Sequence, residues 1–346
     1  MKKLSLLFIG LLLIPSLFLS SCDRGDDIVG GGTSATTFSL LKDYMVANNL
    51  DADKVQVNAD GLKFVVGAPA DAGVALDEFL AKYYIIDIRS NADFTSKGHI
   101  EGAKNVAFTD ILTEAPNSGG KPILVVCYTG QTACYATSLL RMYHPDYSDT
   151  QALKWGMSGW NAATAGPWNG KIGANEADSH TNWSYSAAPA NLPFDPPTLS
   201  SFSIDGSEIL KERVEQVVAD GFGGAASVAT VNGIDVLNTP IDYFVNNYFS
   251  EVDYAGFGHI ANAYRIKENL LLSTNGNLGL NSKTKIASYC YTGQTSAVLT
   301  AWLRVLGYDA YSMLFGMNGI YNTNPVWATN QWGVGSSVPK DLPLVF

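Results

Sequence analysis

Two copies of one cysteine-containing hexapeptide are the residues of this chain that could do chemistry most directly. They agree letter for letter, and the two copies are Cys127-Tyr128-Thr129-Gly130-Gln131-Thr132 and Cys290-Tyr291-Thr292-Gly293-Gln294-Thr295. A thiolate is a strong nucleophile, and it can carry a transferred sulfur atom as a persulfide. Cys127 and Cys290 are therefore the candidate catalytic residues.

The loop after each cysteine is predicted to stabilise a thiolate. A strand-forming run leads into each cysteine and a helix-forming run follows, so the backbone N–H groups at the helix start have no partner within the helix. These groups and the helix dipole should lower the thiol pKa below its free value of ~8.5. Gly130 and Gly293 allow a tight turn, and we expect residues 128–132 and 291–295 to bind substrate. A lone cysteine at a strand end can equally be a small buried residue, but repetition of the whole loop argues against that.

The repetition extends beyond the two loops and defines the fold. Gly98-His99-Ile100 recurs as Gly258-His259-Ile260, and Trp155-Gly156-Met157 recurs as Phe315-Gly316-Met317. Strands are predicted at 83–88, 122–126 and 285–289, and helices at 133–142 and 296–306. Alternating strands and helices predict an α/β protein with two tandem domains, each a parallel sheet flanked by helices on both faces.

The N-terminal residues are typical of an exported lipoprotein. Lys2 and Lys3 precede an apolar run at 4–19, which ends at Ser20-Ser21-Cys22. We expect 1–21 to be a signal peptide, Cys22 to carry lipid and 22–37 to be a flexible tether. The domains are then predicted at 38–175 and 198–346, with a Pro-rich linker at 176–197. The chain would be lipid-anchored in the bacterial cell envelope, facing the periplasm or the cell surface.

The charge of the chain excludes one class of partner. The 346 residues carry a formal charge of −10, and loss of Lys2 and Lys3 with the signal peptide would leave 20 basic against 32 acidic residues. A phosphate backbone would repel so acidic a protein, so nucleic-acid binding is not expected. The lipid expected on Cys22 makes the membrane a partner instead.

The combined motifs resemble the rhodanese family. They are Asp87-Ile88-Arg89, the run Gly98-His99-Ile100-Glu101-Gly102-Ala103, Asn105, the cysteine loop, and the glycine-containing turn at 156–160. The resemblance covers about 38–168 and again about 202–332. The second copy departs from the motif, because Asn247 and Phe249 stand where the first has Asp87 and Arg89.

The resemblance implies a sulfurtransferase. A donor of the thiosulfate or persulfide type would pass its outer sulfur to a cysteine, and a thiophilic acceptor would remove it, without a metal or organic cofactor. The resemblance also implies that Asp87 and Arg89 support the end of a strand, and Arg89 is a further candidate for substrate binding.

Two other functions occur on folds of this kind. Cysteine phosphatases of the same fold need an arginine six residues after the cysteine to clamp phosphate, and those positions hold Ala133 and Ser296. A non-catalytic binding or sulfur-carrier module remains open, because neither loop carries a lysine or arginine to grip an anionic donor.

Three further residues have less specific expectations. Cys134 has no counterpart in the second copy, and it could be a core residue or a resolving thiol for Cys127. His99 and His259 occupy matched positions, and both are expected to be scaffold residues.

Overall fold

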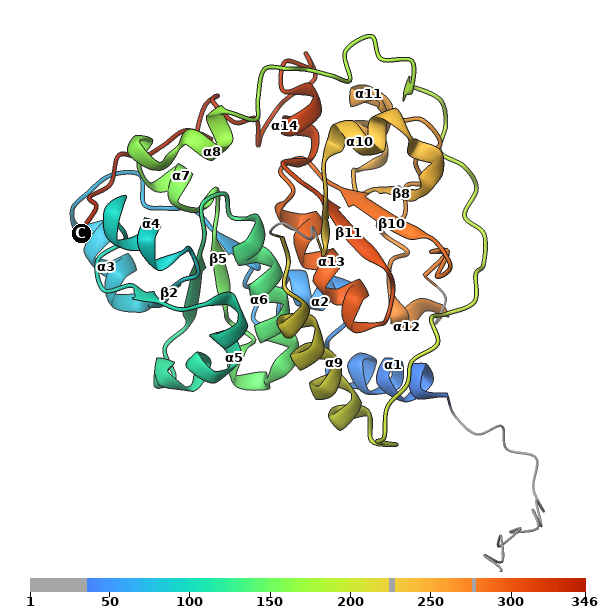
Figure 1. Cartoon of the computed structure of the whole chain (residues 1–346), viewed down its shortest axis with the longest axis horizontal. Helices are drawn as coiled ribbons and strands as arrows, with labels where there is room; N and C mark the ends of the chain where they lie inside the picture. Colours follow the sequence, from blue (N-terminus) through green and yellow to red (C-terminus); the bar gives the residue numbers. More distant parts are fainter. Residues whose placement is uncertain (1–35, 224–227, 276–277) are drawn as a thin grey trace, which may run out of the picture. The chain divides into compact units, whose positions relative to one another are not determined.

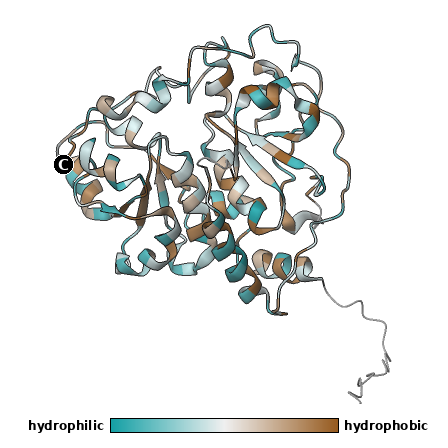
Figure 2. Ribbon diagram, viewed as in Figure 1, coloured by the Kyte–Doolittle hydropathy of each residue, from teal (hydrophilic) through white to brown (hydrophobic). Residues whose placement is uncertain are grey.

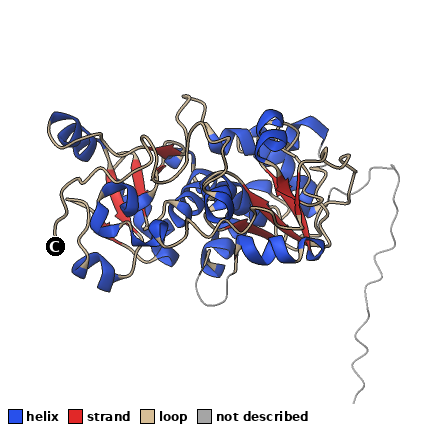
Figure 3. Ribbon diagram, turned by 90° about the horizontal axis from the view of Figure 1, so that it is seen from above, coloured by secondary structure: helices blue, strands red, loops and turns tan. Residues whose placement is uncertain are grey.

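The computed structural model describes residues 36–223, 228–275 and 278–346, and all of its strands except the antiparallel pair β6–β9 form two parallel sheets (Figures 1 and 3). The first sheet has the order β1-β5-β4-β2-β3, with strands β1 Val65–Val66, β2 Tyr84–Asp87, β3 Lys104–Asn105, β4 Ile123–Val126 and β5 Gln151–Leu153. The second has the order β7-β11-β10-β8, with strands β7 Thr230–Val231, β8 Tyr243–Asn247, β10 Lys285–Tyr289 and β11 Ala310–Met313.

Helices cover both faces of the first sheet. Side chains alternate between the faces of a strand, so Ile123 and Val125 of β4 pack with α6, while Leu124 and Val126 pack with α3 and α7. These helices are α6 Gln131–Tyr143, α3 Val74–Lys82 and α7 Gly156–Trp160. Strands β2 and β4 are buried on both sides, as the apolar runs in the sequence predicted, whereas the edge strands β1 and β3 are partly exposed.

The second sheet is covered in the same way. Ile286 of β10 packs with α13, and Ala287 packs on the opposite face with α10, α11 and α14. The bounds of these helices are α13 Gln294–Val305, α10 Gly233–Asn238, α11 Glu251–Phe257 and α14 Gly316–Tyr321. The predicted fold class, α/β with parallel sheets flanked by helices, is confirmed.

The remaining elements are short, apart from two helices that pack on one another. Those two are α1 Thr37–Ala47 and α9 Gly206–Asp220. The other helices are α2 Ala52–Gln56, α4 Asn91–Ser96, α5 Ile111–Glu114, α8 Gly166–Asn169 and α12 Leu272–Asn275. Turns of 3₁₀ helix lie at Phe108–Asp110, Ala115–Ser118, Pro145–Tyr147, Ala162–Thr164 and Pro240–Asp242. Among these described elements, none has the length and apolar composition of a membrane-crossing helix.

The two repeats share one hydrophobic core. Helices α6 and α13 pack directly against each other, and the Ser138 hydroxyl of α6 donates to the carbonyl of Val298 on α13 at 3.0 Å. Hydrophobic residues of both helices, of α1 and of α9 belong to this core (Figure 2). Residues 36–346 form one compact unit, so the domain boundaries at 175 and 198 stay predictions. Residues 1–35, with Cys22, lie outside the described residues.

The C-terminal residues return to the first repeat. His99 and Val345 exchange two backbone hydrogen bonds of 2.8 and 3.0 Å, and the Leu342 N–H donates to the carbonyl of Trp160. The predicted linker also pairs, because β6 Trp183–Ser184 lies antiparallel to β9 His259–Ile260. The C-terminal residues therefore pack on the first repeat, and residues of the predicted linker pair with the second repeat.

A buried ion pair closes the end of β2. The side chains of Asp87 and Arg89 are 0% and 1% exposed, and Arg89 Nη2 lies 2.6 Å from Asp87 Oδ2. Asp87 Oδ1 accepts the Arg89 N–H, and Arg89 Nη2 also donates to the carbonyl of Gly98 at 2.9 Å. In the second repeat Asn247 Oδ1 accepts the Phe249 N–H at 2.9 Å, so an uncharged pair keeps the same turn.

We expect Arg89→Ala to lower the melting temperature, because it leaves the Asp87 carboxylate buried without its cation. Breaking such a pair costs about 3–5 kcal/mol of unfolding free energy. The control is Asp87→Asn with Arg89→Phe, which copies the second repeat and should recover part of that stability in thermal melts. An Arg89→Ala protein with native stability and no activity would make Arg89 a substrate ligand instead.

Candidate functional site

Cys127 lies between β4 and the first turn of α6, where the sequence placed it. Its sulfur accepts hydrogen bonds from the backbone N–H groups of Gly130 at 3.2 Å and Ala133 at 3.3 Å. Gly130 has φ +82°, a left-handed conformation that suits glycine and bends the loop back over the sulfur. Only 5% of Cys127 is exposed. The loop therefore forms a cradle of N–H groups around one sulfur atom.

A second turn supports this loop from below. The N–H of Met157 donates to the carbonyl of Cys127 at 2.8 Å, and the N–H of Ser158 donates to that of Tyr128 at 2.9 Å. Gly156 lies so close that a Cβ there would be 2.3 Å from the Cys127 oxygen. This contact explains physically why a glycine stands in the late turn: no side chain fits between the two loops.

The backbone carbonyls of the Cys290 loop are held as in the first repeat, but the hydrogen bonds to the Cys290 sulfur differ. The N–H groups of Met317 and Asn318 donate to the carbonyls of Cys290 and Tyr291 at 2.9 and 3.1 Å. The Cys290 sulfur accepts from the Ser296 N–H at 3.4 Å and lies 3.7 Å from the Ser296 hydroxyl. Ser296 occupies the position of Ala133, so a hydroxyl is added at this sulfur.

The expected lowering of the Cys127 pKa is wrong. Burial raises the pKa of the Cys127 thiol above its ordinary value, and the N–H groups of Ala133, Thr129 and Gly130 only oppose that effect. The Asp87 carboxylate raises this pKa further. The sequence shows which donors follow the cysteine, but it does not show how much water the folded loop removes from the sulfur.

Cys134 lies in the core shared by the two repeats. None of its surface is exposed, and burial raises the pKa of its thiol well above the ordinary value. Its thiol is free, as are those of Cys127 and Cys290. A fully buried thiol is a poor nucleophile, which favours a core role over that of a resolving thiol.

The tyrosine after each cysteine is packed by opposite kinds of side chain. The Arg89 guanidinium and the Lys97 ammonium lie 5.1 and 5.5 Å from the ring centre of Tyr128. At the matched positions Phe249 and Phe257 pack on Tyr291, with ring centres 4.3 and 6.0 Å apart. Tyr128, next to Cys127, therefore contacts two cations that are each paired with an aspartate, whereas Tyr291, next to Cys290, contacts aromatic rings.

The sequence did not indicate a role for Lys97, because this residue lies outside both cysteine loops. It follows α4 and lies 2.7 Å from Asp93, four residues earlier. Its side chain is 56% exposed. The signal that could have revealed it is its position directly before the Gly98-His99-Ile100 motif, where the second repeat has Phe257.

The threonines and glutamines of the two loops differ in burial and in hydrogen-bond partners. The Thr129 hydroxyl accepts from the Gln131 side chain, and the Thr292 hydroxyl accepts from the Gln294 N–H. Thr132 and Thr295 are half-buried. Gln131 and Gln294 are buried and reach across to the opposite repeat, at Phe315 and Thr129.

The two histidines have backbone contacts. The His99 ring lies 3.0 Å from the carbonyl of Phe94 and stacks on its ring, and His259 does the same with Tyr254 at 3.3 Å. These contacts agree with the expected scaffold role.

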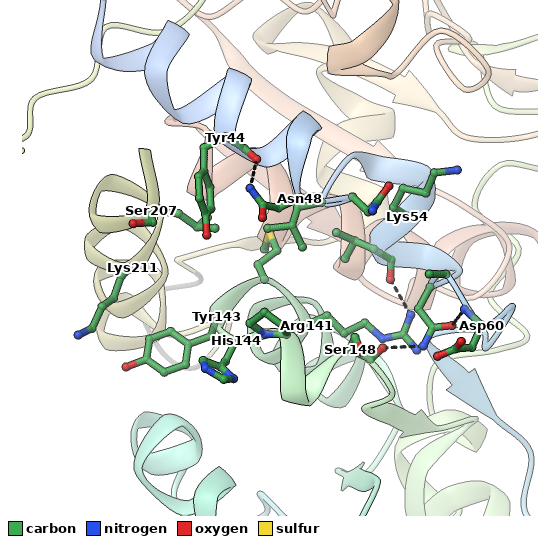
Figure 4. A pocket seen from close by; sticks show the side chains of 18 of the residues that line it. Tyr44, Asn48, Lys54, Asp60, Arg141, Tyr143, His144, Ser148, Ser207 and Lys211 are labelled. Atoms are coloured by element: carbon green, nitrogen blue, oxygen red, sulfur yellow. Dashed lines mark hydrogen bonds between the residues drawn. The ribbon is translucent and has the colours of Figure 1, made fainter. Parts of the chain in front are cut away.

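Neither cysteine lines the cavity of about 440 Å³ that Figure 4 shows from close by. Tyr44 of α1, Tyr143 at the end of α6 and Lys211 of α9 are among the side chains that line it. Cys127 is held at the first turn of α6, and a helix of 13 residues is roughly 20 Å long. The cavity is therefore separate from the sulfur cradle. Within the described part of the chain, no group of three His, Cys, Asp or Glu side chains could hold a metal ion.

Comparisons with known proteins point to one family for the first repeat. The family model "Rhodanese-like domain" matches residues 71–163. The chain is similar to a solved rhodanese-related protein from Thermoplasma volcanium, at 18% identity over 28% of this chain and 88% of that one, with a TM-score of 0.23. It is also similar to a thiosulfate sulfurtransferase from Pseudomonas aeruginosa, at 14% identity over 76% of this chain and 45% of that one, with a TM-score of 0.26.

A third solved structure gives a similar result. It is the 3-mercaptopyruvate sulfurtransferase from Leishmania major, at 13% identity over 72% of this chain and 73% of that one, with a TM-score of 0.25. No curated protein matches the chain. Similarity at this level says nothing about substrates. The segment that holds Cys127, residues 71–163, is therefore similar in sequence to rhodanese-like domains.

Proposed function

We propose that the chain is a sulfurtransferase that moves sulfane sulfur from a donor such as thiosulfate or a persulfide to a thiophilic acceptor. The observation that supports this most is the position of the Cys127 sulfur, which accepts two backbone N–H groups at the start of α6. The same groups suit the anionic terminal sulfur of a persulfide. Cys290 has a related cradle and is the second candidate carrier.

The reaction runs in two steps. The Cys127 thiolate attacks the outer sulfur of thiosulfate, a sulfur–sulfur bond forms, and sulfite leaves with the electron pair of the bond that breaks. The product is a cysteine persulfide anion. An acceptor such as cyanide or a thiolate then attacks the terminal sulfur, and the Cys127 thiolate is regenerated. Because the Cys127 pKa is raised, the thiolate fraction and the rate of the first step should rise with pH through that pKa.

The surroundings of the two cysteines favour Cys127 for anionic donors. Arg89 and Lys97 lie against Tyr128, next to the reactive cysteine, and Lys97 is open to solvent. Positive charge beside a site raises the local concentration of an anion. Phe249 and Phe257 give the Cys290 site no such attraction.

A sulfur-carrier or binding module is the alternative, and the burial of the sulfurs favours it. Cys127 and Cys290 are 5% and 2% exposed, so a donor needs the loop to move before the attack. A carrier would hold a persulfide stably and would show no turnover with small donors.

Turnover distinguishes the two functions. We expect the soluble chain from residue 23 to transfer sulfur from thiosulfate to cyanide, and Cys127→Ser should remove most of this rate. Cys290→Ser should have a smaller effect, and the double variant should be inactive. Thiocyanate formation measures the rate. Turnover that survives in the double variant would rule out both cysteines as carriers.

We expect the Lys97 charge to attract anions to Cys127. In the wild type, the ratio of alkylation by anionic iodoacetate to that by neutral iodoacetamide should be higher at Cys127 than at Cys290. Lys97→Met should lower the ratio at Cys127 about threefold at low salt. Lys42→Met is the control, because Lys42 is also paired with an aspartate and lies on α1. An unchanged ratio in Lys97→Met would contradict the charge argument.

We also propose that Cys22 carries lipid and tethers the protein to the membrane, on the basis of the Ser20-Ser21-Cys22 run after an apolar segment. Labelling of cells with a fatty-acid analogue should mark the wild-type protein and should be lost in Cys22→Ala. Label that persists in Cys22→Ala would show that this cysteine is not the anchor.

A further inference from the structure

One peptide unit of the first cysteine loop connects the two repeats. The carbonyl of Thr129 and the N–H of Gly130 belong to the same planar unit, and in a trans peptide they point in opposite directions. The Gly130 N–H points at the Cys127 sulfur, at 3.2 Å. Whatever holds the Thr129 carbonyl therefore also aims this N–H at the sulfur.

Two side chains hold the Thr129 carbonyl. The indole N–H of Trp168 donates to it at 3.1 Å, and so does the Gln294 side-chain amide at 3.1 Å. Trp168 belongs to the first repeat, but Gln294 begins helix α13 of the second. Gln294 is 3% exposed, and a Cβ on Gly130 would lie 2.4 Å from its Nε2 atom. The contact is close and shielded from water, where a hydrogen bond has most effect on geometry.

We propose that Gln294 of the second repeat is a positioning residue for Cys127 in the first. It fixes the Thr129–Gly130 peptide unit so that the Gly130 N–H stabilises the Cys127 thiolate. The catalytic meaning of this contact rests on the proposed function, whereas its effect on the thiol does not. The second hexapeptide thus serves the first sulfur site, whatever Cys290 does.

The reciprocal contact is not equivalent, which provides a control. Gln131 Oε1 accepts the N–H of Phe315 at 2.7 Å, and Phe315 belongs to the turn under Cys290. Gln131 faces a backbone N–H and must present its amide oxygen, whereas Gln294 faces a backbone carbonyl and must present its amide NH₂ group. Gln131 also donates to the Thr129 hydroxyl at 3.1 Å, but not to its carbonyl. Of the two glutamines at matched positions, Gln294 is therefore the one that holds the carbonyl of the peptide unit facing Cys127.

The test uses the full soluble chain with Gln294→Met and Gln131→Met. Both changes keep the length of the side chain and add no charge. The rate of alkylation by iodoacetamide is measured against pH, separately for the Cys127 and Cys290 peptides, by mass spectrometry. We expect Gln294→Met to shift the Cys127 profile to higher pH, equivalent to an about threefold loss of thiolate below the pKa. The Cys290 profile should stay in place, and Gln131→Met, which removes a contact with the Thr129 hydroxyl but none with its carbonyl, should shift the Cys127 profile less than Gln294→Met does.

Other outcomes would overturn the proposal. An unchanged Cys127 profile in Gln294→Met would show that Trp168 alone aims the peptide unit. Equal shifts at Cys127 and Cys290 would show a general loss of structure, which melting temperatures of both variants check independently. Because alkylation needs no sulfur donor, a shift confined to Cys127 in a protein that never forms a persulfide would support the positioning role and reject the proposed function.

Discussion

A sulfur atom under the first turn of a helix is stabilised only if backbone N–H groups point at it, and the carbonyls of the same peptide units must then point away and find partners. Each loop carbonyl from Cys127 to Gly130 has one. The N–H groups of Met157 and Ser158 take the first two, Trp168 and Gln294 take the third, and the N–H of Cys134 takes the fourth. The late glycine turn and the packing of α6 on α13 both serve this requirement.

The same requirement explains how the two repeats can differ without losing the loop. The carbonyls of Cys290 and Tyr291 are held by the turn after Phe315, as their counterparts are in the first repeat. At the end of β2 and of β8, a side-chain oxygen has to accept the backbone N–H two residues later. Asp87 does this in the first repeat and Asn247 in the second. Charge at that strand end is therefore free to change. In the first repeat Arg89 at the strand end and Lys97 after α4 lie on Tyr128, and in the second repeat Phe249 and Phe257 replace them.

Much of the fold could be predicted from sequence because it is local. Strand β4 and helix α6 lie within a residue or two of the predicted 122–126 and 133–142, since apolar runs and helix periodicity are short-range signals. The positions of Cys127 and Cys290 followed from the same signals. The pairing of Val345 with His99 could not be found this way, because such contacts leave no pattern in either segment.

The partners of the loop side chains could not be predicted from the sequence either. Gln131 and Gln294 were expected at the substrate, but the packing of α6 on α13 takes both side chains to the other repeat. Burial of the Cys127 sulfur, which reverses the expected direction of its pKa, depends on the closed loop and its supporting turn. Both properties arise from tertiary packing that neighbouring residues do not encode.

The central claim is that the N–H cradle at Cys127 holds a transferred sulfur atom. Intact-protein and peptide mass spectrometry after treatment with thiosulfate tests this directly. We expect one added sulfur on the Cys127 peptide, before the Cys290 peptide gains one, and none on the Cys134 peptide. If neither Cys127 nor Cys290 gains sulfur from thiosulfate or from any persulfide donor, the cradle does not serve sulfur transfer and the account is contradicted.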